Sequence, residues 1–243
     1  MTKKKVTPTV GDLDDRLRNG LIVSCQPVDH GPMDDDETVI RLARAAIAGG
    51  AEGLRIEGAA RLQKVRCALP DALIIGIVKR DLENSPVRIT PLSEDVQALA
   101  EAGADVIAVD ATDRVRPVPT FQLIEQINQL GKIAMGDCSS LQDAEGAFAA
   151  GAAIVGTTLS GYTGGPVPAE PDFALLRTLC SKFPRVMAEG RFNTPADCAE
   201  ARRIGAWAVT VGTAITRTEV VAEWFAQAMQ DSTNSMPHEA SVI

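Results

Sequence analysis

Apolar residues along the chain form two kinds of segment, short β-branched runs and longer stretches with apolar residues every three or four positions. Short runs bounded by turn residues are typical of strands buried on both faces, whereas the longer period is typical of amphipathic helices. Helical patterns such as ETVIRLARAAIAGG and TPADCAEARRIG separate the short runs. The predicted strands are residues 21–26, 53–56, 73–79, 106–110, 133–137, 154–157, 186–189 and 208–211.

A repeated Gly-Ala pattern sets the architecture. Four segments each contain a helical run, a glycine, an alanine and a strand, and the glycines are Gly50, Gly103, Gly151 and Gly205. A glycine just past a helix end adopts the left-handed conformation without a Cβ penalty. The spacing of roughly 50 residues suits two strand–helix units, so four copies predict an α/β fold with a single (β/α)8 TIM barrel. The alternative is a doubly wound open sheet, which is disfavoured because no GxGxxG follows the first strand.

The barrel is expected to span residues 18–229. Residues 1–17 are predicted to be an amino-terminal extension, and residues 230–243 to be a flexible carboxyl-terminal tail.

Composition and charge exclude several classes of function. The net charge is −8 and the isoelectric point is near 4.9, which argues against nucleic acid as a partner. No apolar run approaches the length of about 18 residues that a membrane span needs, and no secretory signal is seen. The five cysteines are scattered without a CxxC pair, which predicts reduced thiols in the cytoplasm. With only two histidines, His30 and His238, we expect no histidine-rich metal site.

Polar residues collect at the predicted carboxyl ends of the strands. Active sites of these barrels lie at that end, on the loops that follow the strands. The opposite ends are mostly Gly, Ala and small loops. The residues in question include Gln26, Arg55, Lys79, Asp110, Asp137, Thr157, Thr158, Glu189, Arg191, Gly212, Thr213 and Arg217.

Arg55 and Lys79 are the cations of this rim whose surroundings are most apolar. Arg55 either reaches the barrel mouth as a catalytic or anion-binding group, or faces a helix and pairs with Glu52. Lys79 ends the run IIGIVKRD, and strand alternation predicts that Asp81 shares its side while Arg80 points the other way. Burial and a neighbouring cation, Arg80 or Arg55, are expected to lower the pKa of Lys79 towards the neutral form.

The last two strands carry a predicted phosphate site. Gly190 and Arg191 follow the seventh strand, and Gly212 and Thr213 open a helix after the eighth. Main-chain N–H groups at these two positions are the usual phosphate cradle of this barrel, and Arg217 would add charge to the same anion. We therefore expect a phosphorylated substrate.

Two further segments have alternative interpretations. The Gly/Pro-rich loop 158–172 is either a binding loop or a surface excursion that packs between subunits. The acidic run 34–37 is interpreted as a helix amino terminus rather than a metal site.

The available residue types restrict the chemistry. No GxSxG elbow, HExxH, Walker loop or EF-hand is present. Lysine, glutamate and arginine above a phosphate cradle suit proton transfer at a carbon beside a carbonyl. A Schiff base also needs a neutral lysine, so a lyase or aldolase acting through Lys79 remains an alternative, as does a non-catalytic sensor of phosphosugars.

The motifs GLIVSCQ, GAEGLRIEG, IIGIVKRD, MGDCSS, GTTLSGYT, AEGRFNTP and GAWAVTVGTAITRTE resemble the N-acetylmannosamine-6-phosphate 2-epimerases. The resemblance covers about residues 18–228. It implies a cytoplasmic isomerase of bacterial sialic acid catabolism that interconverts N-acetylmannosamine 6-phosphate and N-acetylglucosamine 6-phosphate. It implies no metal and no organic cofactor, and we expect a homo-oligomer with no nucleic acid or membrane partner.

The resemblance also implies roles for individual residues. Lys79 is expected to be the acid/base at C2 and Glu189 its carboxylate partner. Gln26, Arg55, Asp137 and Arg217 are expected to bind the open-chain sugar and its phosphate. Either Glu189 or a substrate hydroxyl would relay the proton to the second face of C2.

Overall fold

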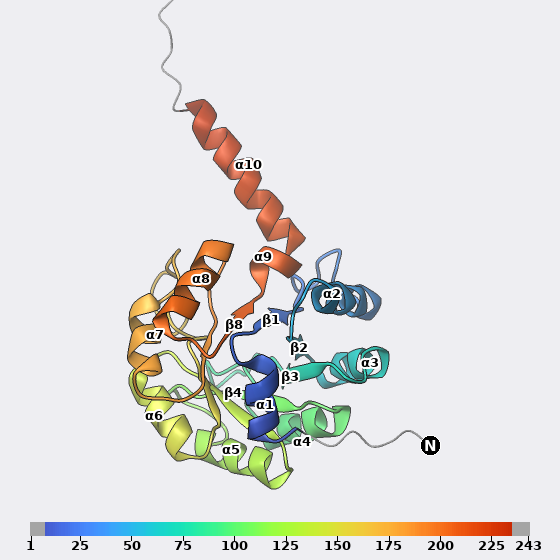
Figure 1. The fold of residues 1–243 in the computed structure, drawn as a ribbon, viewed down its shortest axis with the longest axis vertical. Coiled ribbons are helices and arrows are strands. Elements are labelled where there is room, and N and C mark those ends of the chain that lie inside the picture. The colour runs from blue at the N-terminus through green and yellow to red at the C-terminus, as the bar shows by residue number, and fades with distance from the viewer. Residues whose placement is uncertain (1–7, 235–243) are drawn as a thin grey trace, which may run out of the picture.

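Eight parallel strands form a closed barrel in the computed structural model, which describes residues 8–234 (Figure 1). Neighbouring strands follow chain order, and the last pairs with the first, with Leu21 opposite Val209. The predicted (β/α)8 barrel is confirmed, and the open sheet is excluded. The strands are β1 (Leu21–Ser24), β2 (Gly53–Glu57), β3 (Leu73–Ile77), β4 (Val106–Asp110), β5 (Ile133–Asp137), β6 (Ile154–Gly156), β7 (Val186–Ala188) and β8 (Ala208–Val211).

Helices alternate with the strands and surround the barrel (Figure 1). Their apolar faces pack on the outer side of the strands, which explains why the strands read as continuous apolar runs. The helices are α1 (Val10–Leu17), α2 (Asp36–Ala48), α3 (Ala59–Ala68), α4 (Ser93–Ala102), α5 (Thr120–Gln129), α6 (Leu141–Ala149), α7 (Phe173–Cys180), α8 (Pro195–Ile204), α9 (Thr213–Thr216) and α10 (Thr218–Asn234).

The repeated glycines occupy the conformation that the sequence predicts. Gly50, Gly103, Gly151 and Gly205 have φ angles of 99°, 97°, 100° and 111°. Each therefore reverses the chain after a helix without the steric penalty that a Cβ would add. In each case the next strand begins three residues later.

The third strand is shorter than predicted because, after Ile77, the main chain leaves the barrel ladder and hydrogen-bonds to residues 89–90 instead. β3 ends at Ile77, and the Thr90 amide then donates to the Val78 carbonyl at 2.7 Å. Lys79 forms an antiparallel bridge with Ile89. Residues 78–90 thus fold back as a hairpin above the barrel. Lys79 is carried by that hairpin rather than by the strand.

The amino-terminal extension contains a helix that closes the amino end of the barrel. Leu13 and Leu17 of α1 are fully buried and pack with the barrel residues Ile22 and Leu73. Leu13 and Leu17 therefore belong to the hydrophobic core and attach α1 to the barrel. Thr9 caps the helix by accepting from the Asp12 amide at 3.2 Å.

The acidic run 34–37 begins α2, as predicted. Asp35 is the N-cap and accepts a hydrogen bond of 2.9 Å from the Thr38 amide. Asp34 pairs with Arg61 of α3 at 2.9 Å. These carboxylates therefore serve helix capping and helix–helix pairing.

The carboxyl-terminal helix leaves the barrel. α9 lies between α8 and α2, where the eighth helix of such a barrel would pack, and α10 projects outward from it (Figure 1). Trp224 and Phe225 of α10 are exposed. Of the tail expected at 230–243, positions up to Asn234 belong to α10, and the rest lies outside the described residues. No helix in residues 8–234 is long and apolar enough to cross a membrane.

Candidate active site

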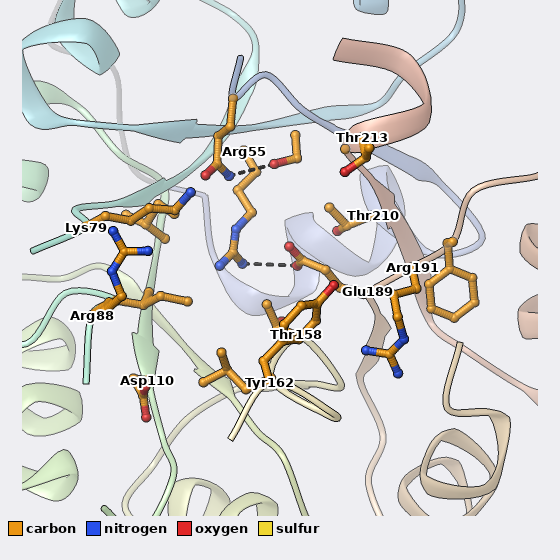
Figure 2. Close-up of a pocket in the computed structure, with 18 of the residues that line it drawn as sticks. Arg55, Lys79, Arg88, Asp110, Thr158, Tyr162, Glu189, Arg191, Thr210 and Thr213 are labelled. Carbon is orange, nitrogen blue, oxygen red and sulfur yellow. Dashed lines mark hydrogen bonds and ion pairs between the residues drawn. The ribbon is translucent and has the colours of Figure 1, made fainter. Parts of the chain in front are cut away.

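A cavity of about 410 Å³ opens at the carboxyl ends of the strands. Figure 2 shows Lys79 and Arg88 on one side and Arg191 on the other, with Glu189 and Thr158 between them. Nine of the ten predicted site residues line this cavity, namely Gln26, Arg55, Lys79, Glu189, Gly190, Arg191, Gly212, Thr213 and Arg217.

Asp137 is the predicted residue that does not line the cavity wall. It ends β5, is fully buried, and holds Arg55 with Oδ1 at 3.2 Å from Nη1 and Oδ2 at 2.6 Å from Nη2. The Thr158 hydroxyl also donates to Oδ1 at 2.7 Å. Its contacts therefore orient Arg55 from behind rather than face a ligand.

Arg55 links Asp137 to the catalytic candidate Glu189. Its Nη1 lies 3.1 Å from Oε2 of Glu189, and only about 1% of the side chain is exposed. The alternative pairing with Glu52 is wrong, because Glu52 instead accepts from the Leu21 amide at 2.8 Å. One buried guanidinium thus serves two buried carboxylates.

Glu189 is poised to exchange a proton near neutral pH. Burial raises its pKa to about 7, with Asp137 adding to the increase and Arg55 opposing it. Thr157 fixes its backbone, donating from Oγ1 to the Glu189 carbonyl at 2.8 Å and accepting from the Glu189 amide at 3.1 Å. The carboxyl group is therefore held in place while its charge state remains variable.

Lys79 faces the cavity in an environment that disfavours its charge. Burial lowers its pKa and Arg217 lowers it further, while Asp29 and Glu57 act in the opposite direction. Arg55 contributes a smaller decrease, as expected from the sequence. The lysine is thus closer to its neutral form than a solvated one would be.

Arg80 points away from Lys79, as strand alternation predicts, and pairs with Asp95 of α4 at 2.7 Å. It is therefore not the cation that lowers the pKa of Lys79. Asp81 is largely exposed, pairs with Arg88 and does not line the cavity beside Lys79, because the hairpin, not the β3 ladder, directs residues 79–81. Of the cations that lower the pKa of Lys79, Arg217 acts more strongly than the predicted Arg55, and it comes from the other end of the barrel sequence.

The residues predicted to hold a phosphate follow β7 and β8 and line the cavity. Gly190 and Arg191 both have positive φ, 102° and 63°. Arg191 donates from Nε to the Glu170 carbonyl at 2.7 Å, and its guanidinium lies 5.3 Å from the Tyr162 ring centre. Arg191 thereby connects loop 158–172 to the cavity wall.

Gly212 lies close to β1, since a Cβ there would sit 3.3 Å from that of Ser24. Arg217 donates from Nε to the main-chain carbonyl of Gln26 at 3.0 Å, which holds the Arg217 side chain against the backbone after β1. The Gln26 amide nitrogen itself donates to Oγ of Ser24 at 2.6 Å.

Sequence reasoning missed several cavity residues. Arg88 reaches the site because the hairpin folds back, which local patterns do not reveal. Arg114 is held by Asp110 at 2.6 Å and by Thr112. Thr158 was recognised as a strand-end residue, but no role was assigned to it.

The cavity is basic although the whole chain is acidic. Its lining contains two carboxylates, Asp110 and Glu189, and six basic side chains. The basic residues are Arg55, Lys79, Arg88, Arg114, Arg191 and Arg217. This local excess of positive charge suits an anionic ligand.

Comparisons with known proteins agree with this geometry. The family model described as "Putative N-acetylmannosamine-6-phosphate epimerase" matches residues 39–231. Proteins of Klebsiella pneumoniae and Escherichia coli with the corresponding 2-epimerase description are each 55% identical over 223 residues, covering 91% of this chain and 95% and 97% of theirs. The solved structure of the N-acetylmannosamine-6-phosphate 2-epimerase from Clostridium perfringens has a TM-score of 0.86 and 34% identity, covering 89% of this chain and 96% of that one.

Proposed function

Because this chain belongs to the N-acetylmannosamine-6-phosphate epimerase family, we propose that Lys79 and Glu189 exchange protons with C2 of the sugar. The enzyme interconverts N-acetylmannosamine 6-phosphate and its C2 epimer, N-acetylglucosamine 6-phosphate. The observation that carries the mechanism is the pairing, on one cavity, of a lysine with a lowered pKa and a carboxyl with a raised pKa.

The proposed reaction begins with the open-chain sugar, in which C1 is an aldehyde. A neutral Lys79 takes the C2 proton and becomes an ammonium, leaving an enolate across C1 and C2. The new charge on Lys79 and the neighbouring Arg217 stabilise that enolate in a site partly shielded from water.

Reprotonation from the other face inverts C2. We propose that Glu189 supplies this proton, because burial holds its pKa at about 7 and keeps a large fraction protonated at neutral pH. In the reverse direction the two groups exchange roles. Arg55, which is itself held by Asp137, holds Glu189 in position for both directions.

The phosphate group is assigned to the β7–β8 side of the cavity. Gly190, Arg191, Gly212 and Thr213 line that side, and Arg217 adds a further positive charge. Gln26, fixed beside Arg217, is assigned to the sugar. Binding the phosphate here would leave the rest of the open chain to extend towards Lys79 and Glu189.

Exchange of the C2 proton with heavy water, followed by NMR, tests the assignment of the base. Lys79→Ala is expected to lower C2 exchange by at least about 1,000-fold while the fold is retained. Lys182→Ala is the control, since Lys182 lies on the surface and pairs with Glu145. Full exchange in Lys79→Ala would refute the assignment. An adduct trapped by borohydride on Lys79, without C2 exchange, would favour the lyase or aldolase alternative.

We also propose that the enzyme is a homo-oligomer in the cytoplasm and acts in sialic acid catabolism. The projecting α10 with exposed Trp224 and Phe225 supports a contact with a second copy, and the five cysteines, all within the described chain, are unpaired thiols. Light scattering should give a molar mass for the wild type that is a multiple of the mass of one chain. Trp224→Glu with Phe225→Glu should shift the mass towards one chain; a monomeric wild type would contradict the proposal.

A further inference from the structure

Thr158 is the second residue after β6 and lies between the carboxyl groups of Asp137, which is buried, and Glu189, which is largely buried. Its hydroxyl donates to Oδ1 of Asp137 at 2.7 Å and lies within hydrogen-bonding reach of the Glu189 carboxylate. The side chain also lines the cavity. One hydroxyl group therefore touches both acids of the buried cluster.

The charges around Glu189 make this hydroxyl important. Asp137 and Glu189 share Arg55, whose Nη1 lies 3.2 Å from the first carboxylate and 3.1 Å from the second. Lys79 is the other charged group that acts on Glu189. When Glu189 is ionised, two carboxylates depend on one guanidinium and one hydroxyl.

A threonine hydroxyl has one proton and can donate it to one acceptor at a time, while its oxygen can also accept. If Glu189 is protonated, it can donate to Oγ1 of Thr158 while Thr158 donates to Asp137. If Glu189 is ionised, the same hydroxyl can rotate and donate to Glu189, leaving Asp137 with the two bonds from Arg55.

We propose that Thr158 is a positioning residue that sets the protonation of Glu189 by switching its hydrogen bond between Asp137 and Glu189. The inference rests on the role proposed above for Glu189 in C2 epimerisation. Thr158 donates to Asp137 when Glu189 is protonated and to Glu189 when Glu189 is ionised, so it stabilises both charge states of Glu189. Glu189 can then lose a proton and regain it within one turnover without leaving a buried oxygen unsatisfied.

The neighbouring Thr157 provides a matched control. It is a buried threonine that also lies beside Glu189, but its hydroxyl bonds the main chain of Glu189, at 2.8 Å and 3.1 Å, and not the carboxylate. Removing the Thr157 hydroxyl would loosen Glu189 without removing a donor from its charged group. A purely structural effect and a protonation effect can therefore be separated.

The experiment is the pH dependence of kcat/KM for epimerisation in the wild type, Thr158→Val, Thr158→Ser and Thr157→Val. Thr158→Val is expected to move the lower limb of the profile up by about 1 pH unit, because ionised Glu189 loses a donor. Thr158→Ser should restore the wild-type limb. Thr157→Val should lower activity without moving the limb. An unshifted limb in Thr158→Val, or an equal shift in Thr157→Val, would overturn the proposal.

A second measurement does not depend on turnover. The Glu189 carboxyl can be titrated by ¹³C NMR in the wild type and in Thr158→Ala, with its signal assigned by its loss in Glu189→Gln. The pKa of Glu189 should be higher in Thr158→Ala; an unchanged pKa would overturn the proposal even if Thr158→Val does not fold. If the wild type shows no C2 exchange, the proposed function fails, and this titration still decides the role of Thr158.

Discussion

Two arginines at opposite ends of the barrel hold buried carboxylates in different ways. Arg66, at the amino end, pairs with Asp105 at 2.7 Å and donates its remaining hydrogen bonds to main-chain carbonyls, among them Gly103 and Ala72. Arg55, at the carboxyl end, divides its donors between Asp137 and Glu189, and no group in residues 8–234 accepts from its Nε. In this comparison the first cluster is balanced, with one arginine for one carboxylate, whereas the second is unbalanced, with one arginine for two carboxylates.

The difference separates stability from function. The pair of Arg66 and Asp105 lies outside the cavity and serves the fold. At the carboxyl end, burial raises the pKa of Glu189 and the second carboxylate, Asp137, raises it further, which is what a group that must gain and lose protons requires. The carboxyl end therefore gives up some stability where the reaction takes place.

Replacing each arginine by methionine is the strongest test of this contrast. Arg55→Met should lower the free energy of unfolding by about 3–5 kcal/mol at pH 8, because two buried carboxylates lose their cation. Activity should fall by at least about 1,000-fold. The loss of stability should shrink at pH 5, since a raised acid pKa favours the folded state at low pH. Denaturant unfolding of the wild type and Arg55→Met at pH 8 and pH 5 measures this difference in free energy of unfolding.

Arg66→Met is the matched control at the amino end. It should also destabilise the protein, but kcat should stay at the wild-type value at temperatures where the variant is folded. If Arg66→Met reduced kcat as strongly as Arg55→Met, the division of roles between the two ends would be wrong.

Glu189→Gln tests the cost of the unbalanced cluster with a smaller expected effect. The pKa of Glu189 is about 7 in the folded protein against 4.5 for an ordinary glutamate, so the ionised group destabilises the fold above pH 7 and not below about 4.5. Glu189→Gln should therefore be more stable than the wild type at pH 8, by about 1–3 kcal/mol. The gain should disappear near pH 4. Equal stability at pH 8 would mean that the cluster carries no such cost.

The sequence predicts the strands and their ends better than it predicts the side-chain contacts of the candidate site. Strand ends at Asp110, Asp137 and Val211 agree with the prediction because apolar runs and turn residues are local signals. Arg88 was not among the predicted site residues, and Asp137, predicted to bind the sugar, contacts Arg55 and is absent from the cavity lining. Arg88 depends on a hairpin that folds over the barrel.

The place of Asp137 depends on the depth to which Arg55 reaches inside the barrel, which is set by packing between strands that are distant in sequence. The candidate residues could be identified from the predicted strand ends. Which of their side chains form ion pairs with one another could not be predicted. Burial and the contacts of Arg55 with Asp137 and Glu189 set the protonation of Glu189, and these contacts join residues distant in sequence, so the chemistry of Glu189 had to be read from the structure.

The smallest expected effect comes from Asp14 at the amino end, whose pH dependence should have the opposite sign to that of Glu189. Hydrogen bonds from Arg185, and then from Trp207 at 2.8 Å, lower the pKa of Asp14 below its usual value of 3.8. Its stabilisation is therefore present above pH 4 and is lost as the pH falls through the lowered pKa. Asp14→Asn should cost about 1 kcal/mol at pH 7, because the group is partly exposed and screened, and should leave kcat unchanged. Denaturant unfolding at pH 7 and pH 3 should show that the loss in free energy of unfolding caused by Asp14→Asn is smaller at pH 3. The loss caused by Arg55→Met should already be smaller at pH 5. If Asp14→Asn changed the pH profile of catalysis, the two ends of the barrel would be electrostatically coupled and the contrast between them would have to be abandoned.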